Sequence, residues 1–218
     1  MLLDNPKHVK LRKKTKEALL SHMAAWLRTD EYSPYNYTVE DVVFRLAGTG
    51  SLGLARYAFL LKSANEAGPK YMLLDMKEAA PSSLAPFVTA AQPAWSCEAE
   101  RVVTLQKRMQ NRFPALLSFT RYEDRSFIIQ EMQPTKDNIN FTLLNDRYRD
   151  MYSVIDSMAM LTASSHIRST GQDGSCITDD LKAFGRRDDW QPAILAYAKT
   201  CAQCNKQYYN AFLTDLDG

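Results

Sequence analysis

Three of the eight glycines of this 218-residue chain lie within Gly48-Thr-Gly50-Ser-Leu-Gly53, directly after an apolar run. A turn with so few side-chain atoms lets backbone N–H groups approach phosphate oxygens. The spacing therefore predicts a phosphate-binding turn in which Gly48, Gly50, Ser51 and Gly53 surround the phosphates. A plain tight turn between two strands would have the same composition.

Two nucleotide-binding interpretations fit the residues that follow. In the dinucleotide interpretation, Leu54 begins a helix whose N-terminus holds a pyrophosphate, and Asp75 binds ribose about 20 residues later. In the kinase-like interpretation, residues 54–61 form a strand returning from a Gly-rich lid over ATP, and Lys77 on the next strand contacts the phosphates. An ordinary surface lysine would occupy this position equally well. Whether residues 54–61 form a helix or a strand separates the two interpretations.

A helix is predicted over residues 97–112, with Ser96 as its N-cap. Two acidic residues, Glu98 and Glu100, lie in its first turn. In a kinase-like site, the lysine that binds phosphate has an acidic partner on the helix after its strand. This interpretation therefore assigns Glu100, or Glu98, to orient Lys77.

The hydropathy pattern predicts an α+β fold with a helical first segment, an antiparallel sheet and a helical last third. Apolar residues at intervals of three and four predict a helix over residues 7–28. The runs 42–47, 54–61 and 71–77 are expected to form one antiparallel sheet, and 116–122 with 127–132 a hairpin. Helix is predicted from residue 148 onward. The expected organisation is a basic helical leader (1–38), a sheet-bearing lobe with the Gly-rich loop and one helix (39–133), and a helical lobe (134–218).

Composition excludes several classes of function. The chain has 27 Lys and Arg against 25 Asp and Glu, and a net charge of +2 makes neither nucleic acid nor a membrane surface the expected partner. The basic residues between positions 7 and 16 have no aromatic residues among them and are interpreted as a solvated helix face. Because no apolar run approaches the ~18 residues of a membrane span and no signal sequence is evident, the chain is expected to be cytoplasmic.

The four cysteines are Cys97, Cys176, Cys201 and Cys204. So few cysteines in a chain of this size are typical of a reducing compartment. Cys201 and Cys204 have the spacing of zinc and redox pairs, but they lie in a helical pattern with no second closely spaced pair. The prediction is that all four are reduced and hold no metal.

Five segments occur in a recognisable order along the chain. They are Leu46-Ala-Gly-Thr-Gly-Ser-Leu-Gly-Leu-Ala-Arg-Tyr57, Met76-Lys-Glu-Ala79, Glu100-Arg-Val-Val103, Gln130-Glu-Met-Gln133 and Ser165-His-Ile-Arg168. Their joint order resembles the bacterial domain-of-unknown-function family 2252, over nearly the whole chain. This resemblance implies a fold related to protein kinases and aminoglycoside phosphotransferases, and it favours ATP over a dinucleotide.

The resemblance also implies that part of a kinase-like site is missing. In that family the segments similar to a catalytic loop and a metal-binding segment precede the Gly-rich loop, in a circularly permuted order, and this chain is expected to begin after them. Downstream, His166 lacks the Asp and Asn of a catalytic loop, and Ala183-Phe-Gly185 has alanine in place of a magnesium ligand. No catalytic residue and no metal ligand is therefore assigned.

The favoured prediction is thus an incomplete kinase-like fold that cradles ATP and is inactive alone. Mg²⁺ would bind only if a partner supplied its ligands, and the expected partner is a second chain with the missing half or a second copy of this one. One alternative is a non-catalytic binding or structural remnant of that fold. The other is a dinucleotide-binding fragment of an oxidoreductase.

Overall fold

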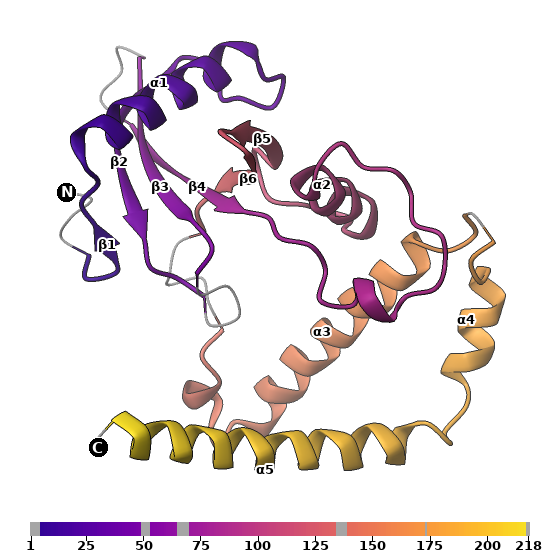
Figure 1. Cartoon of the computed structure of the whole chain (residues 1–218). Helices are drawn as coiled ribbons and strands as arrows, with labels where there is room; N and C mark the ends of the chain where they lie inside the picture. Colours follow the sequence, from indigo (N-terminus) through magenta and orange to yellow (C-terminus); the bar gives the residue numbers. More distant parts are fainter. Residues whose placement is uncertain (1–4, 49–52, 65–69, 134–138, 173, 217–218) are drawn as a thin grey trace. The chain divides into compact units, whose positions relative to one another are not determined.

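A computed structural model describes residues 5–48, 53–64, 70–133, 139–172 and 174–216. The chain divides into two compact units, Met1–Arg168 and Ser169–Gly218. The first unit contains the sheet and the helices that pack on it, and the second contains two helices (Figure 1). The residues from which the sequence predicts a nucleotide site all belong to the first unit.

One antiparallel sheet of six strands forms the centre of the first unit (Figure 1). Its strand order is β1-β2-β3-β4-β6-β5. The strands are β1 (His8–Val9), β2 (Tyr37–Arg45), β3 (Arg56–Ser63), β4 (Tyr71–Glu78), β5 (Ser118–Tyr122) and β6 (Arg125–Glu131). The predicted sheet of residues 42–47, 54–61 and 71–77 is confirmed, and so is the hairpin that follows.

Strand β3 settles the choice between helix and strand after the Gly-rich turn. It pairs with β2 on one side and β4 on the other, so the helix required by the dinucleotide interpretation is wrong. Phe59 and Leu61 face one side of the sheet, whereas Ala58 and Leu60 face the other, and all four are buried. A strand buried on both faces has a continuous apolar sequence that local propensity does not distinguish from a helix.

Helix α1 (Lys13–Thr29) covers one face of the sheet (Figure 1). Leu19, Met23 and Trp26, spaced by four and three residues, form its buried stripe. They pack with Phe59 and Leu61 of β3 into the main hydrophobic core. The segment predicted as a basic leader is thus part of the core of the first unit.

The predicted start of this helix at residue 7 is wrong. His8 and Val9 form β1, which pairs with Phe44 and Arg45 at the end of β2. The backbone of Arg12 is extended, and the helix begins one residue later at Lys13. Pairing with the edge of the sheet satisfies backbone groups that a helix would otherwise have satisfied.

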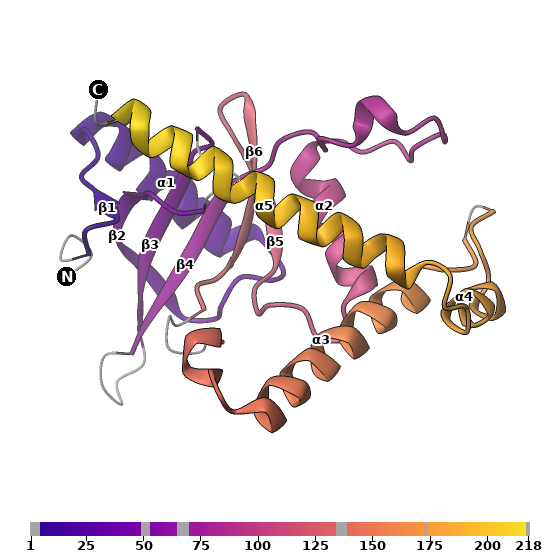
Figure 2. The same cartoon turned by 90° about the horizontal axis from the view of Figure 1, so that it is seen from below.

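The remaining helices follow the sequence prediction closely. They are α2 (Glu98–Met109), α3 (Tyr148–Arg168), α4 (Thr178–Gly185) and α5 (Gln191–Leu216), with short 3-10 turns η2 (Ala85–Phe87) and η4 (Phe141–Leu144). Figure 2 shows α4 and α5 as the two helices of the second unit. The rings of Phe184 and Trp190 stack between these two helices, with centroids 5.5 Å apart. Among the described residues, no helix combines the length and the apolar character needed to cross a membrane.

His22 connects α1 to the edge strand β5. Its Nε2 atom lies 3.0 Å from the hydroxyl of Thr120, and its ring centroid is 5.1 Å from that of Tyr122. Burial lowers the pKa of His22 below its ordinary value of 6.5. The folded protein therefore favours the neutral imidazole, because charging a buried ring costs free energy.

Replacing Phe59 with Ala should lower the free energy of unfolding by about 3–5 kcal/mol, because a fully buried ring in the main core is removed. Urea denaturation measures the change. Phe87→Ala is the matched control, since this ring is 82% exposed and its loss should change stability by less than about 0.5 kcal/mol. Equal losses in the two variants would contradict the assignment of the core.

The stability of the protein should also fall as the pH drops below 6.5. Between the lowered folded pKa of His22 and the ordinary value of 6.5, the unfolded chain binds more protons than the folded protein. The contribution of the neutral ring is complete above 6.5 and is lost as the pH falls through the folded pKa. Urea midpoints at several pH values should fall less steeply in His22→Gln than in the wild type, and identical pH profiles would refute the role of this ring.

Candidate functional site

The Gly-rich turn joins β2 to β3. Gly48 and Gly53 both have left-handed backbone angles, with φ of 87° and 93°. Glycine adopts this conformation without the strain that a Cβ atom introduces. Gly50 and Ser51 lie outside the described residues, so their predicted roles at phosphate stay predictions.

The far end of this turn is fixed by Glu78 at the end of β4. The Ala55 N–H donates to the Glu78 carboxylate at 2.8 Å, and the Glu78 N–H donates to the Ala55 carbonyl at 2.9 Å. The guanidinium of Arg125 also donates to this carboxylate, at 3.2 Å. A charge-assisted network thus holds the first residue after the turn against the central strand.

Lys77 lies on the face of the sheet opposite α1. It pairs across the strands with Arg56 of β3, and paired residues in an antiparallel sheet point to the same face. Arg45 of β2 lies beside Arg56, because the preceding Phe44 pairs with Tyr57. Arg45, Arg56 and Lys77 therefore form a cationic row across three neighbouring strands.

Asp75 lies two residues from Lys77 on the same face of β4, and its side chain is 2% exposed. Its Oδ1 atom accepts from Arg56 Nε at 2.7 Å and from Arg45 Nη1 at 3.1 Å. Arg56 Nη2 donates to the other carboxylate oxygen, which makes this pair bidentate. Asp75 therefore holds both guanidinium groups and does not have the exposed position that ribose binding in the dinucleotide interpretation requires.

An apolar patch lies next to the cationic row on the same face. It consists of the buried Val43, Ala58 and Leu60 together with the partly buried Leu73 and Met132. Ala58 pairs with both Val43 and Asp75. It is also the next residue after Arg56 on this face of β3, so the patch borders the cationic row directly. This face thus combines positive charge with an apolar surface.

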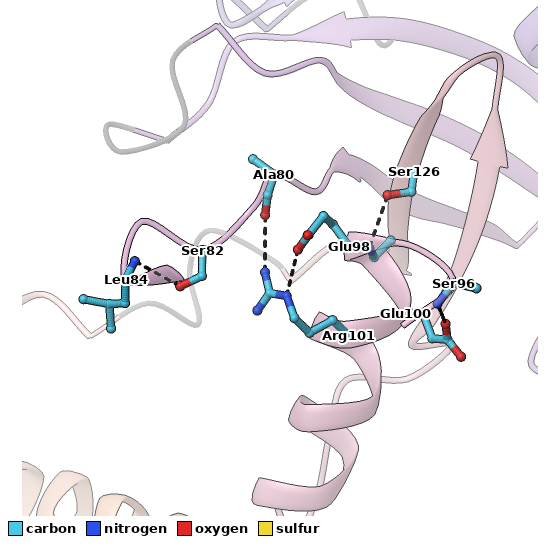
Figure 3. Close-up of polar contacts among 9 residues, drawn as sticks. Ala80, Ser82, Leu84, Ser96, Glu98, Glu100, Arg101 and Ser126 are labelled. Atoms are coloured by element: carbon cyan, nitrogen blue, oxygen red, sulfur yellow. Dashed lines mark hydrogen bonds and ion pairs between the residues drawn. The ribbon is translucent and has the colours of Figure 1, made fainter. Parts of the chain in front are cut away.

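The two glutamates of α2 have partners other than Lys77. Figure 3 shows Glu98 next to Arg101 and Glu100 directed toward Ser96. The Glu98 carboxylate accepts from Arg101 Nε at 2.7 Å, and that of Glu100 accepts from the Ser96 N–H at 2.5 Å. The predicted ion pair between Lys77 and either glutamate is therefore not formed.

The start of α2 also differs from the prediction. The N-cap is Cys97, not Ser96, and the last helical residue is Met109 because the backbone of Gln110 is extended. Hydrogen bonds from the side chain and backbone of Ser96 lower the pKa of Glu100 below its usual value. Glu100 thus binds the backbone just before the helix, and the predicted cap by the Ser96 side chain is not formed.

Arg101 determines where the Glu98 side chain lies. It is three residues after Glu98 on the helix, and its Nη2 atom also donates to the Ala80 carbonyl at 3.3 Å (Figure 3). Residues three apart face each other on a helix, so this contact is local. The helix is anchored to the sheet separately, because the Ala99 N–H donates to the Ser126 hydroxyl at 3.2 Å.

Cys97 lines a small polar cavity of about 370 Å³ with Arg121 and Ser126. Burial acts to raise the pKa of this thiol, but hydrogen bonds from the Glu100 backbone and the side chains of Arg121 and Ser126 lower it below its usual value. All four cysteines of the chain are unpaired in the structure. The described residues contain no group of His, Cys, Asp or Glu arranged to hold a metal ion.

Another cavity lies elsewhere in the first unit, between the end of α2 and helix α3. It has a volume of about 670 Å³ and is lined by Met109, Phe113, Leu161 and neighbouring residues. None of the residues that the sequence assigned to nucleotide lines it. Beside the apolar patch, a cavity of about 320 Å³ is lined in part by Gln130 and Met132 of the sheet face that holds Lys77.

Of the cationic row, the sequence pointed to Lys77 but not to Arg45 and Arg56. The arginines differ from other surface charges only in their register, since each occupies the strand position that faces the same side as Lys77. One signal was available in the sequence: if residues 54–61 and 71–77 are aligned as antiparallel strands, Arg56 lies opposite Lys77 or near it. The contact with Asp75 has no local pattern, because its three residues come from three strands.

The comparisons with known proteins give one result. A family model described as an uncharacterised protein conserved in bacteria, DUF2252, matches residues 1–215. No curated protein and no solved structure matches the chain. The resemblance inferred from the five sequence segments is therefore confirmed at the level of the family.

Replacing Asp75 with Asn should lower the free energy of unfolding by about 3–5 kcal/mol, because two partly buried guanidinium groups lose their shared carboxylate. Asp41→Asn is the matched control. Its carboxylate pairs with Lys16 near the surface, and the loss should be about 1 kcal/mol or less. Urea denaturation tests both variants, and an unchanged Asp75→Asn protein would show that this cluster does not stabilise the sheet.

Proposed function

We propose that this chain, which belongs to the conserved bacterial family DUF2252, binds ATP on the sheet face that holds Lys77. It would act as the nucleotide-cradling half of a kinase-like, phosphotransferase-like fold. The phosphates would lie between the Gly-rich turn and Lys77, and the base would lie on the apolar patch.

The observation that favours this function most is the state of Lys77. Its side chain lies half-buried on β4, and within the described part of the chain its ammonium has no hydrogen bond or ion pair. A half-buried ammonium without a partner gains from any anion that reaches it. The apolar patch beside it offers the kind of surface that nucleotide pockets combine with a few polar groups.

The order of the elements supports a kinase-like arrangement over a dinucleotide fold. A glycine turn joins the first two long strands, the lysine lies on the next strand, and a helix and a hairpin follow. This is the order that the kinase-like interpretation requires. A dinucleotide fold requires parallel strands, whereas every strand pair among the described residues is antiparallel.

The proposal covers binding and not phosphoryl transfer. Transfer needs Mg²⁺ and a positioned nucleophile, and the sequence assigns neither role to a residue of this chain. The predicted partner, a second chain or a second copy of this one, belongs to that catalytic step. The alternative of a non-catalytic remnant has the same fold but no nucleotide, so a binding experiment separates the two.

In calorimetric titrations with ATP and Mg²⁺, the Kd of Lys77→Met should be about tenfold or more higher than that of the wild type, because a charge-assisted contact with phosphate is lost. Lys62→Met is the matched control. Lys62 lies on β3 and pairs with Tyr71, at the opposite end of the same sheet face, so its loss should leave the affinity unchanged.

Two results would count against the proposal. Equal ATP affinity in the wild type and Lys77→Met would remove Lys77 from the site. A wild-type protein that binds no ATP at millimolar concentration would favour the non-catalytic remnant.

A further inference from the structure

The cationic row contains more positive charge than the protein around it neutralises. Arg56 and Lys77 are directly opposite each other, and Arg45 is on the next strand. Like charges in directly opposed positions destabilise a sheet. Within the described part of the chain, Asp75 is the one carboxylate in contact with the row, so an excess of two positive charges is left.

Both guanidinium groups keep most of their hydrogen-bond donors unused. A guanidinium has five N–H donors, of which Arg45 uses one and Arg56 two toward Asp75. Neither side chain has another partner among the described residues, and they are 23% and 19% exposed. The unused donors are therefore held in place by Asp75, and part of each group is open to solvent.

We infer that Arg45 and Arg56 bind phosphate groups beside Lys77, and that the ligand is a polyphosphate with at least two linked phosphates. This inference rests on the proposed function and specifies its substrate class as a nucleoside di- or triphosphate. The guanidinium pair and the Lys77 ammonium are two centres of positive charge on neighbouring strands, and linked phosphates engage both. Planar guanidinium groups bind phosphate through paired donors, which the point charge of a lysine does not provide.

Asp75 is a positioning residue in this arrangement. Its single carboxylate draws two guanidinium groups from different strands to the same oxygen atom. The groups are thus ordered before the ligand arrives, which reduces the entropy lost on binding. The carboxylate itself repels phosphate, so Asp75 acts through the arginines and not by direct contact.

The test is calorimetric titration of the full chain with inorganic phosphate, pyrophosphate and tripolyphosphate, and separately with ATP. The wild type should bind tripolyphosphate most tightly and phosphate most weakly. Arg56→Gln should raise the Kd for tripolyphosphate and for ATP about tenfold or more, because charge-assisted contacts are lost. Lys62→Met, at the far end of the same face, should bind both as the wild type does.

A double variant, Arg56→Gln with Asp75→Asn, separates specific donors from net charge. It removes one positive and one negative group, so the net charge of the cluster stays the same, while Arg45 loses its carboxylate partner. Arg56→Gln alone keeps Asp75 paired with Arg45, so it is the variant expected to fold most readily, and the urea midpoint of each variant is measured before titration. If Arg56 contacts phosphate, the double variant also binds tripolyphosphate about tenfold or more weakly than the wild type.

The outcomes distinguish this inference from the proposed function. If ATP binding falls in Lys77→Met but the double variant binds as the wild type does, the inference is overturned and the proposed function stands. If tripolyphosphate binding depends on Arg56 but ATP does not bind, the polyphosphate site stands and the nucleotide function fails. Equal affinity for phosphate and tripolyphosphate overturns the inference, and a wild type that binds none of these ligands overturns both.

Discussion

The ion pairs of Asp75 connect the strands on which the candidate site is built. The carboxylate belongs to β4, and its guanidinium partners belong to β2 and β3, the two strands that the Gly-rich turn joins. This cluster therefore fixes the end of the hairpin where the turn begins and ends. On the other edge of that turn, Glu78 binds the backbone of Ala55. These two carboxylates, three residues apart on β4, thus hold the end of β2 and the residue before β3 next to the strand of Lys77.

The sequence predicted those elements of the fold whose structure is determined by residues close together in the chain. The hairpin of β5 and β6 was predicted because the polar residues Glu123 and Asp124 separate two apolar runs. Local propensity did not decide between helix and strand for residues 54–61, because the Leu, Ala and Arg residues of this segment are good helix formers. Pairing with β2 and β4 decides for strand, and this pairing is visible only in three dimensions.

The candidate site was also predicted in part, because some of its features depend on local residues and others on contacts between strands. The sequence predicted a turn at the glycines, where Gly48 and Gly53 have left-handed backbone angles, and it placed Lys77 on the correct strand. It also predicted Lys77 to be the partner of Glu98 or Glu100, but both glutamates bind residues close to them in the chain. Arg101 competes from three residues away, and the N–H of Ser96 competes at the helix end. Local partners prevail because they require less chain to be ordered.

The alternation of side chains along β3 separates the structural role of this strand from its functional one. Tyr57, Phe59 and Leu61 face α1 in the main core, whereas Arg56, Ala58 and Leu60 face the opposite side with the cationic row and the apolar patch. Stability is concentrated on the first face, so the second face can hold unneutralised cations that would cost stability in a core. Helix α1 stabilises the sheet from one face, and the charged surface occupies strands β2 to β4 on the other. This division explains how Lys77, half-buried and with no partner among the described residues, persists beside a well-packed core.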